Sequence, residues 1–244
     1  MRLDKFLTTL GVCSRKDASR LAARGAITVN GTVVKRADTS ISPDKDEVCL
    51  NGTPLLYEEF VYVMLNKPEG YVSATEDGSF PVVTSLLSET LQRRGLFPAG
   101  RLDKDTVGFM LLTDDGALAH ALLSPKRHVE KEYAFTLSLP LKEGAEERFL
   151  AGIPLKEGIT KSARLTMSAD RLSGRITLTE GRYHQIKRMM QYEGSEVIFL
   201  ERLSFGGLTL DPTLQRGEWR PLSTEEIEAL RKAPVQVESK SVTQ

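Results

Sequence analysis

The chain has 244 residues, of which 40% are hydrophobic and 27% charged, and its equal numbers of basic and acidic side chains give a formal net charge of zero. These values are typical of a soluble protein with a core, and no apolar run approaches the ~18 residues that span a membrane. An acid in the opening MRLDKF, where a signal peptide would have its apolar stretch, argues against secretion, so we expect a cytoplasmic chain with Cys13 and Cys49 reduced. The three histidines are scattered and predict no metal site.

Charge is distributed unevenly along the chain. Residues 1–36 contain eight Lys or Arg and two acids, a net charge of +6, so the remainder carries −6. Such asymmetry predicts that the N-terminal end binds an anionic partner such as nucleic acid. The basic residues of this end are Arg2, Lys5, Arg15, Lys16, Arg20, Arg24, Lys35 and Arg36.

The N-terminal end is predicted to form a small module. Ser14 is a helix N-cap with an acid three residues later, and Gly25 is a helix stop. Asn-Gly pairs at 30–31 and 51–52 each predict a β-hairpin.

Three basic residues of the predicted helix, Lys16, Arg20 and Arg24, are spaced four apart and share one face. That face is either simply solvated or a surface that follows RNA phosphates. We favour the second interpretation, because a solvated face usually mixes charges and no acid interrupts this one in the sequence.

The larger C-terminal part, from about residue 60, alternates short apolar runs with turns. Strands are predicted at 60–66, 107–113, 132–139 and 175–181, and helices at 115–123, 184–193 and 224–231. Because strands outnumber helices and do not alternate with them strictly, the predicted fold class is α+β. Residues 56–60 are read as a connection, and residues 233–244 as a disordered tail.

Two motifs carry polar groups in patterns that suggest chemistry. GRLDKDTVGFMLLTDDG (100–116) places four carboxylates around an apolar run, and these are either turn acids or include one catalytic group. GRYHQIKRM (181–189) puts His184, Lys187 and Arg188 on one side of a helix, as a solvated basic face or as a cluster of donors. No phosphate-binding glycine loop or nucleophile elbow is present.

The N-terminal module resembles the S4 RNA-binding domain over roughly residues 1–56. The matching residues are RLDKFL (2–7), Ser14 with Arg15, and the pattern G-x-I-x-V-N-G-x-V (25–33). The resemblance implies binding of structured RNA through the two basic helices and the following loop.

Residues 60–232 resemble the catalytic domain of RNA pseudouridine synthases, a mainly antiparallel mixed sheet. The 100–116 motif is similar to the family pattern G-R-L-D-x-x-T-x-G-L-L-L-L-T-x-D-G, with Phe109 and Met110 in place of two leucines. NKPEGYVSAT (66–75), KEYAFTL (131–137) and EGRYHQIKRM (180–189) resemble the other family motifs, in the expected order.

The resemblance implies a cofactor-independent isomerase. Asp103 is the expected nucleophile, Lys187 the cation that pairs with it, and Tyr133 an active-site residue that either stacks on the base or transfers a proton. Because the uridine must leave its helix or loop, Arg101 is expected to fill the vacated stack or hold the flipped nucleotide. Arg182 and Arg188 join the N-terminal basic residues as expected RNA contacts.

Within the family, SPKRHVEKEY and GRYHQIKRM look most like the A-type enzymes of small-subunit 16S rRNA, whose target is uridine 516. The expected partner is 16S rRNA or a small-subunit assembly intermediate, with no membrane and no small-molecule cofactor, and the chain is expected to be a monomer. Three alternatives stay open: a synthase of large-subunit 23S rRNA, a non-catalytic S4 ribosome-assembly factor, and a glycosidase of small substrates. The last leaves the basic module unexplained.

Overall fold

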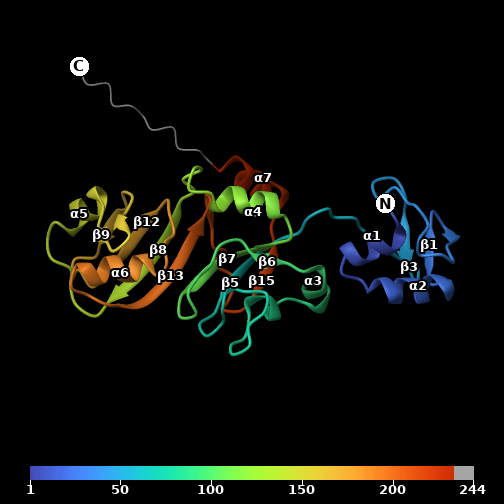
Figure 1. The fold of residues 1–244 in the computed structure, drawn as a ribbon, viewed down its shortest axis with the longest axis horizontal. Coiled ribbons are helices and arrows are strands. Elements are labelled where there is room, and N and C mark those ends of the chain that lie inside the picture. The colour runs from blue at the N-terminus through green and yellow to red at the C-terminus, as the bar shows by residue number, and fades with distance from the viewer. Residues whose placement is uncertain (234–244) are drawn as a thin grey trace, which may run out of the picture.

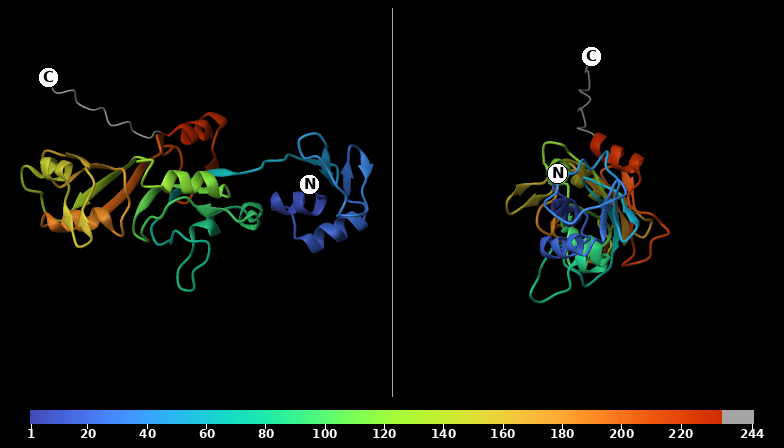
Figure 2. Two further views of the ribbon diagram at one scale, coloured as in Figure 1. Left: turned by 45° about the horizontal axis from the view of Figure 1, so that its top comes forward. Right: turned by 90° about the vertical axis from the view of Figure 1, so that its right-hand side faces the viewer.

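The computed structural model describes residues 1–233 and shows an elongated molecule (Figures 1 and 2). A small module with a four-stranded sheet occupies the N-terminal end, and a nine-stranded sheet with its covering helices forms the rest. An extended stretch between β4 and β5 joins the two.

The N-terminal module packs two helices on one small sheet. Its elements are α1 (Leu3–Thr9), α2 (Arg15–Ala23), β1 (Ile27–Val29), β2 (Thr32–Val33), β3 (Val48–Leu50) and β4 (Thr53–Leu55). The hydroxyl of Ser14 accepts a hydrogen bond from the backbone N–H of Asp17, which starts α2 where the sequence predicted. Asn30 and Asn51 adopt positive φ angles, and both predicted hairpins are present.

The larger C-terminal part contains eleven strands among the described residues. They are β5 (Tyr62–Lys67), β6 (Phe97–Pro98), β7 (Val107–Thr113), β8 (Lys131–Leu137), β9 (Pro154–Leu155), β10 (Gly158–Ile159), β11 (Arg164–Met167), β12 (Ser173–Leu178), β13 (Val197–Phe205), β14 (Leu208–Thr209) and β15 (Trp219–Pro221). The helices are the 3₁₀ turn η1 (Val83–Leu86), α3 (Glu89–Arg94), α4 (Gly116–Leu123), α5 (Ala145–Ala151), α6 (Gln185–Tyr192) and α7 (Thr224–Lys232).

The main sheet has the order β11-β12-β8-β13-β7-β5-β15, with β14 beside β13 and β6 beside β7. Among the described strands every pairing in this sheet is antiparallel except that of β7 with β13. The mainly antiparallel α+β fold predicted from the sequence is therefore confirmed.

The two faces of this sheet bury different apolar sets. Alternate residues of β5 and β7 point to opposite faces, so Val63 and Leu65 lie in one core and Tyr62 and Met64 in the other. Helix α6 contributes Ile186, Met189 and Met190 to the first core, while α4 and α7 cover the second.

The parallel junction of β7 and β13 depends on a glycine. Gly108 has a φ of +98°, and a Cβ atom there would lie 2.3 Å from the carbonyl oxygen of Arg202. Only glycine allows this approach, which brings the first turn of the 100–116 motif against β13. Strand β13, although the longest in the sheet, was not among the predicted elements.

Several short elements were also missed. They are the helices α3 and α5, the 3₁₀ turn η1 and the strands β6, β9, β10, β11, β14 and β15. The predicted tail begins at Ala233, which is buried at the end of α7. The rest of that predicted tail, residues 234–244, lies outside the described residues. No helix within residues 1–233 is both long enough and apolar enough to cross a membrane.

Candidate active site

A cavity of about 590 Å³ opens at the centre of the main sheet. Its walls come from the 100–106 loop before β7, from β8 and β13, and from the 178–187 segment that links β12 to α6. Asp103, Tyr133 and Lys187, the three predicted catalytic residues, all line it although they are far apart in the sequence.

Asp103 stands on a loop that the chain holds at several backbone points. Its carbonyl oxygen accepts from the N–H of Thr106 (3.1 Å). The Ser73 hydroxyl donates to the carbonyl of Leu102 (2.7 Å) and accepts from its N–H (2.9 Å). These bonds fix the backbone on both sides of the carboxylate.

Beneath this loop lies Lys67, at the end of β5, with its side chain fully buried. Its ammonium donates to the carbonyl oxygens of Pro68 (3.1 Å), Lys104 (3.2 Å) and Thr106 (2.7 Å). Burial lowers the pKa of Lys67 to about 8, although the charges of Asp105 and Asp103 act in the opposite direction. Lys67 therefore ties the backbone of Lys104 and Thr106, in the loop that carries Asp103, to the end of β5.

Two cationic or protonatable groups of the α6 segment face the Asp103 carboxylate. The Lys187 ammonium lies 3.3 Å from one oxygen, and Nε2 of His184 lies 3.4 Å from the other. Lys187 is closer still to Asp105, at 2.6 Å. Burial opposes the charge of Lys187, but the hydrogen bond to Asp105 and the two carboxylate charges together raise its pKa.

The expected pairing of Lys187 with Asp103 is thus shared with a second acid. Sequence reasoning treated Asp105 as an ordinary loop acid, whereas the structure gives it the shorter contact with the lysine. Asp114 and Asp115 follow β7 and have structural roles away from Asp103. Asp114 pairs with Arg94, and Asp115 caps α4.

His184 was expected inside the helix but lies just before it. Its φ of +47° is the left-handed region, where a non-glycine residue is strained unless neighbours hold it. The imidazole stacks on Tyr183, with ring centroids 3.8 Å apart, and Tyr183 itself is 72% exposed. This geometry turns His184 toward Asp103.

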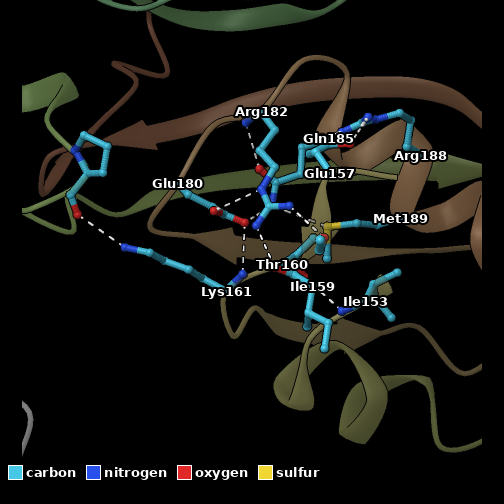
Figure 3. Close-up of polar contacts among 12 residues, drawn as sticks. Ile153, Glu157, Ile159, Thr160, Lys161, Glu180, Arg182, Gln185, Arg188 and Met189 are labelled. Carbon is cyan, nitrogen blue, oxygen red and sulfur yellow. Dashed lines mark hydrogen bonds and ion pairs between the residues drawn. The ribbon is translucent and has the colours of Figure 1, made fainter. Parts of the chain in front are cut away.

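A polar cluster around Glu180 holds the same segment in place (Figure 3). One Glu180 oxygen accepts from the backbone N–H of Lys161 (3.0 Å) and from the side-chain amide of Gln185 (2.7 Å). The other oxygen accepts from Arg182 Nε (3.3 Å). The Gln185 carbonyl in turn accepts from the backbone N–H of Arg182 (2.9 Å).

The two arginines of this segment that were predicted to contact RNA are engaged within the protein. Arg182 donates to the carbonyls of Gly158 (2.8 Å) and Ile159 (2.6 Å) in the β10 strand, and Arg188 pairs with Glu157. Both anchor the α6 segment to the β9–β10 hairpin. Arg101, by contrast, is exposed at the cavity.

The floor of the cavity carries two cations that the sequence reasoning did not select, Lys131 and Arg202. Arg202 is 1% exposed, and its Nε donates to the carbonyl of Phe109 (2.7 Å). A Lys-x-Tyr spacing places Lys131 on the same face of β8 as Tyr133, and this pattern could have identified the lysine. Arg202 had no such signal, because its strand was not recognised.

The basic residues of the N-terminal module are all exposed. Three of them have acidic partners: Arg2 pairs with Asp4 (2.8 Å), Arg20 with Asp17 (3.1 Å) and Arg36 with Asp38 (2.8 Å). The predicted basic stripe of α2 is therefore not free of acids. Lys16 and Arg24, on the same face, form no ion pair within the described residues.

The described part of the chain holds no group of three or more His, Cys, Asp or Glu side chains able to ligate a metal. A carboxylate held between a lysine and a histidine, in a cavity that also presents a tyrosine and an exposed arginine, is suited to chemistry at a glycosidic carbon such as that of a nucleoside. Together with the S4-like module, this defines the class as an RNA-modifying enzyme.

Comparison with known proteins identifies the family. Residues 61–192 match the RNA pseudouridylate synthase family model, and residues 1–48 match the S4 domain. The chain belongs to the RNA pseudouridylate synthase family and is an RNA isomerase of that family with an N-terminal S4 domain.

Its relatives align over nearly the whole chain. The uncharacterized RNA pseudouridine synthase YtzG of Bacillus subtilis is 43% identical over 94% of this chain and 98% of its own length. Ribosomal small subunit pseudouridine synthase A of Escherichia coli is 43% identical over 93% of this chain and 98% of its own. A crystal structure of a pseudouridylate synthase superposes with a TM-score of 0.67 at 39% identity, covering 94% of this chain and 99% of that chain.

Proposed function

We propose that the enzyme converts one uridine of small-subunit 16S rRNA, uridine 516 of the family, to pseudouridine, with Asp103 as the nucleophile. The observation that carries the proposal is the Asp103 carboxylate, held in the cavity between Lys187 and His184. The relatives named as ribosomal small subunit pseudouridine synthase A support the choice of rRNA. Such a substrate implies action in the cytoplasm, and we expect a monomer without a cofactor.

The reaction breaks the bond from N1 of uracil to C1′ of ribose and rejoins the ring through C5. The Asp103 carboxylate attacks C1′ or stabilises the positive charge that develops there, as carboxylates do in glycosidases. The Lys187 ammonium, 3.3 Å away, compensates the negative charge of this carboxylate inside the cavity. Tyr133, whose ring lines the same cavity and is buried, is suited to stack on the base or to accept a proton.

Substitution of Asp103 by Asn tests this function. The variant keeps the size of the side chain but removes the charge, so we expect no pseudouridine at the target in rRNA from cells that contain only Asp103→Asn. Mapping of pseudouridine across 16S and 23S rRNA gives the result. The wild-type gene restored to the same strain is the control.

The mapping also separates the alternatives. Full modification in the variant would exclude Asp103 as the nucleophile. Loss of a pseudouridine from 23S rRNA instead would assign a large-subunit target. No lost modification in a deletion strain would favour an assembly factor without catalysis.

A further inference from the structure

Two cations at the floor of the cavity lie beside each other without a carboxylate partner. Within the described residues, Lys131 and Arg202 form no ion pair, whereas Lys187 a few ångströms from Asp103 contacts two acids. The Lys131 ammonium donates only to the carbonyl of Val129 (3.0 Å). Both cations lie over the ring of Phe205. Arg202 Cζ is 5.1 Å and Lys131 Nζ 5.6 Å from the ring centroid.

This arrangement is unfavourable in the free protein. Partial burial and, to a smaller extent, the neighbouring charge of Arg202 together lower the pKa of Lys131 to about 8. A cation taken out of water costs free energy unless an anion or several acceptors compensate it, and here the buried Arg202 lies beside the half-buried Lys131. Unpaired cations at the bottom of a substrate cavity are expected when the bound ligand supplies the compensating negative charge.

A third polar group in the same cavity also lacks a partner. The hydroxyl of Thr106, three residues after Asp103, is buried without a hydrogen bond among the described residues. Buried hydroxyls are rarely left unsatisfied, so this atom is a second indication that a polar ligand fills the cavity.

The positions of the two cations indicate which part of a nucleotide they contact. Tyr133 lies opposite Arg202 in the β8–β13 pairing, and Lys131 lies two residues before Tyr133 on β8. The cations therefore border the tyrosine expected to meet the base, and Arg202 is almost completely buried. A phosphate on the flexible RNA backbone is better served by exposed cations such as Arg101.

We propose that Lys131 and Arg202 form an anion subsite for the carbonyl oxygens of the target uracil, an inference that rests on the function proposed above for Asp103. When the N1–C1′ bond breaks, its electron pair leaves with the base, so the uracil becomes an anion with charge on N1, O2 and O4. A carboxylate–C1′ bond or a cationic sugar takes the place of the broken bond. After the ring turns, C5 bonds to C1′, the C5 proton is lost and N1 gains a proton.

The uracil anion exists only once the N1–C1′ bond breaks. The subsite therefore increases the reaction rate and does not strengthen binding of the neutral uridine. Donors aimed at developing charge in a water-excluded site are each worth about 100-fold in kcat. We expect Lys131→Met, which keeps the length of the side chain but removes the charge, to lower the single-turnover rate by about 100-fold. RNA affinity should change by less than about threefold, because the uridine in the ground state is neutral.

Three variants make the test specific. Lys131→Arg retains a cation and should retain most of the rate. Lys142→Met removes an exposed lysine outside the cavity and is the matched control. Thermal unfolding of all three shows whether any loss of rate reflects loss of structure.

A modified substrate distinguishes stabilisation of the leaving base from a structural role. Fluorine at C5 makes the uracil anion less basic, so that it depends less on a neighbouring cation. On a 16S rRNA fragment with 5-fluorouridine at the target, the rate ratio of wild type to Lys131→Met, followed as loss of the fluorouridine nucleoside, should be at least tenfold smaller than on the uridine fragment. Equal ratios on the two fragments, or an unchanged rate in Lys131→Met, would overturn the proposal.

A phosphate in the subsite would give a different pattern. Lys131→Met would then weaken RNA binding as much as it lowers the rate, and the fluorine would not matter, which would also overturn the proposal. If wild type leaves the uridine fragment unmodified, the 16S target is wrong, and the same comparison is made on the rRNA that the enzyme does modify.

Discussion

At the scale of single residues, buried charge organises the active site. Lys67, Lys131 and Arg202 lie below the Asp103 loop, and Lys187 lies beside it. The charge of Arg202 contributes to lowering the pKa of both Lys67 and Lys131. A group of cations of this kind attracts negative charge to the cavity.

Lys67 is expected to hold the 100–106 loop in place, and the free-energy cost of burying its charge depends on pH. Its pKa of about 8 in the folded protein lies below the unfolded value of 10.5, so the unfolded chain binds more protons between these values. The cost of burying its charge is therefore present in full below about pH 8 and disappears as pH rises toward 10.5. Lys67→Met removes that cost but leaves three carbonyls without their donor, a loss of about 2 kcal/mol.

The free energy of unfolding lost in Lys67→Met should consequently be larger at pH 9.5 than at pH 7. Denaturant unfolding of wild type and variant at both pH values measures it, with Lys142→Met as the control. A difference that stays constant or shrinks at the higher pH would contradict the prediction.

At the scale of elements, the start of α6 is placed by contacts outside the helix itself. Glu180 joins the end of β12 to Lys161, Arg182 and Gln185 (Figure 3), and Arg182 and Arg188 reach the β9–β10 hairpin. These bonds hold His184 in its left-handed conformation and so aim it, with Lys187, at Asp103.

Glu180→Ala removes three hydrogen bonds from this support. Because small displacements of catalytic groups are costly, we expect kcat to fall by about 100-fold while RNA affinity remains close to that of wild type. Single-turnover rates and filter binding measure the two effects separately. Glu228→Ala, which breaks an exposed pair with Lys232 on α7, is the control. An equal fall in affinity would show that Glu180 acts on RNA binding instead.

At the scale of the whole molecule, the exposed cations of the N-terminal module and the cavity lie in separate parts of the chain. The S4 module carries exposed cations at one end of the elongated molecule, while the cavity lies in the main sheet. We therefore expect the module to contribute affinity through contacts with phosphates, and the cavity to contribute the chemistry.

Binding should weaken steeply with salt, because each phosphate contact releases counterions. We expect Lys16→Ala and Arg24→Ala each to reduce the slope of log affinity against log salt by about one, with the rate at saturating enzyme unchanged. Lys232→Ala, in α7, should leave the slope as it is. A slope that does not respond to the first two substitutions would exclude this face of α2 as the docking surface.

Sequence alone determined the local elements and the motif residues. Capping residues and Asn-Gly turns are short-range signals, so α2 and both N-terminal hairpins were predictable. The strand pattern around 107–113 and the family motifs likewise identified Asp103, Tyr133 and Lys187, which the fold brings to one cavity.

Only the tertiary structure decided how charges meet. The pairing of Lys187 with Asp105, the internal partners of Arg182, and the juxtaposition of Lys131 with Arg202 join residues from separate elements. Such contacts depend on strand order and on the close approach that Gly108 allows, and neither is encoded in local spacing. Electrostatic energy depends on distance in space and on burial, so the role of each charge could be assigned only after folding placed it.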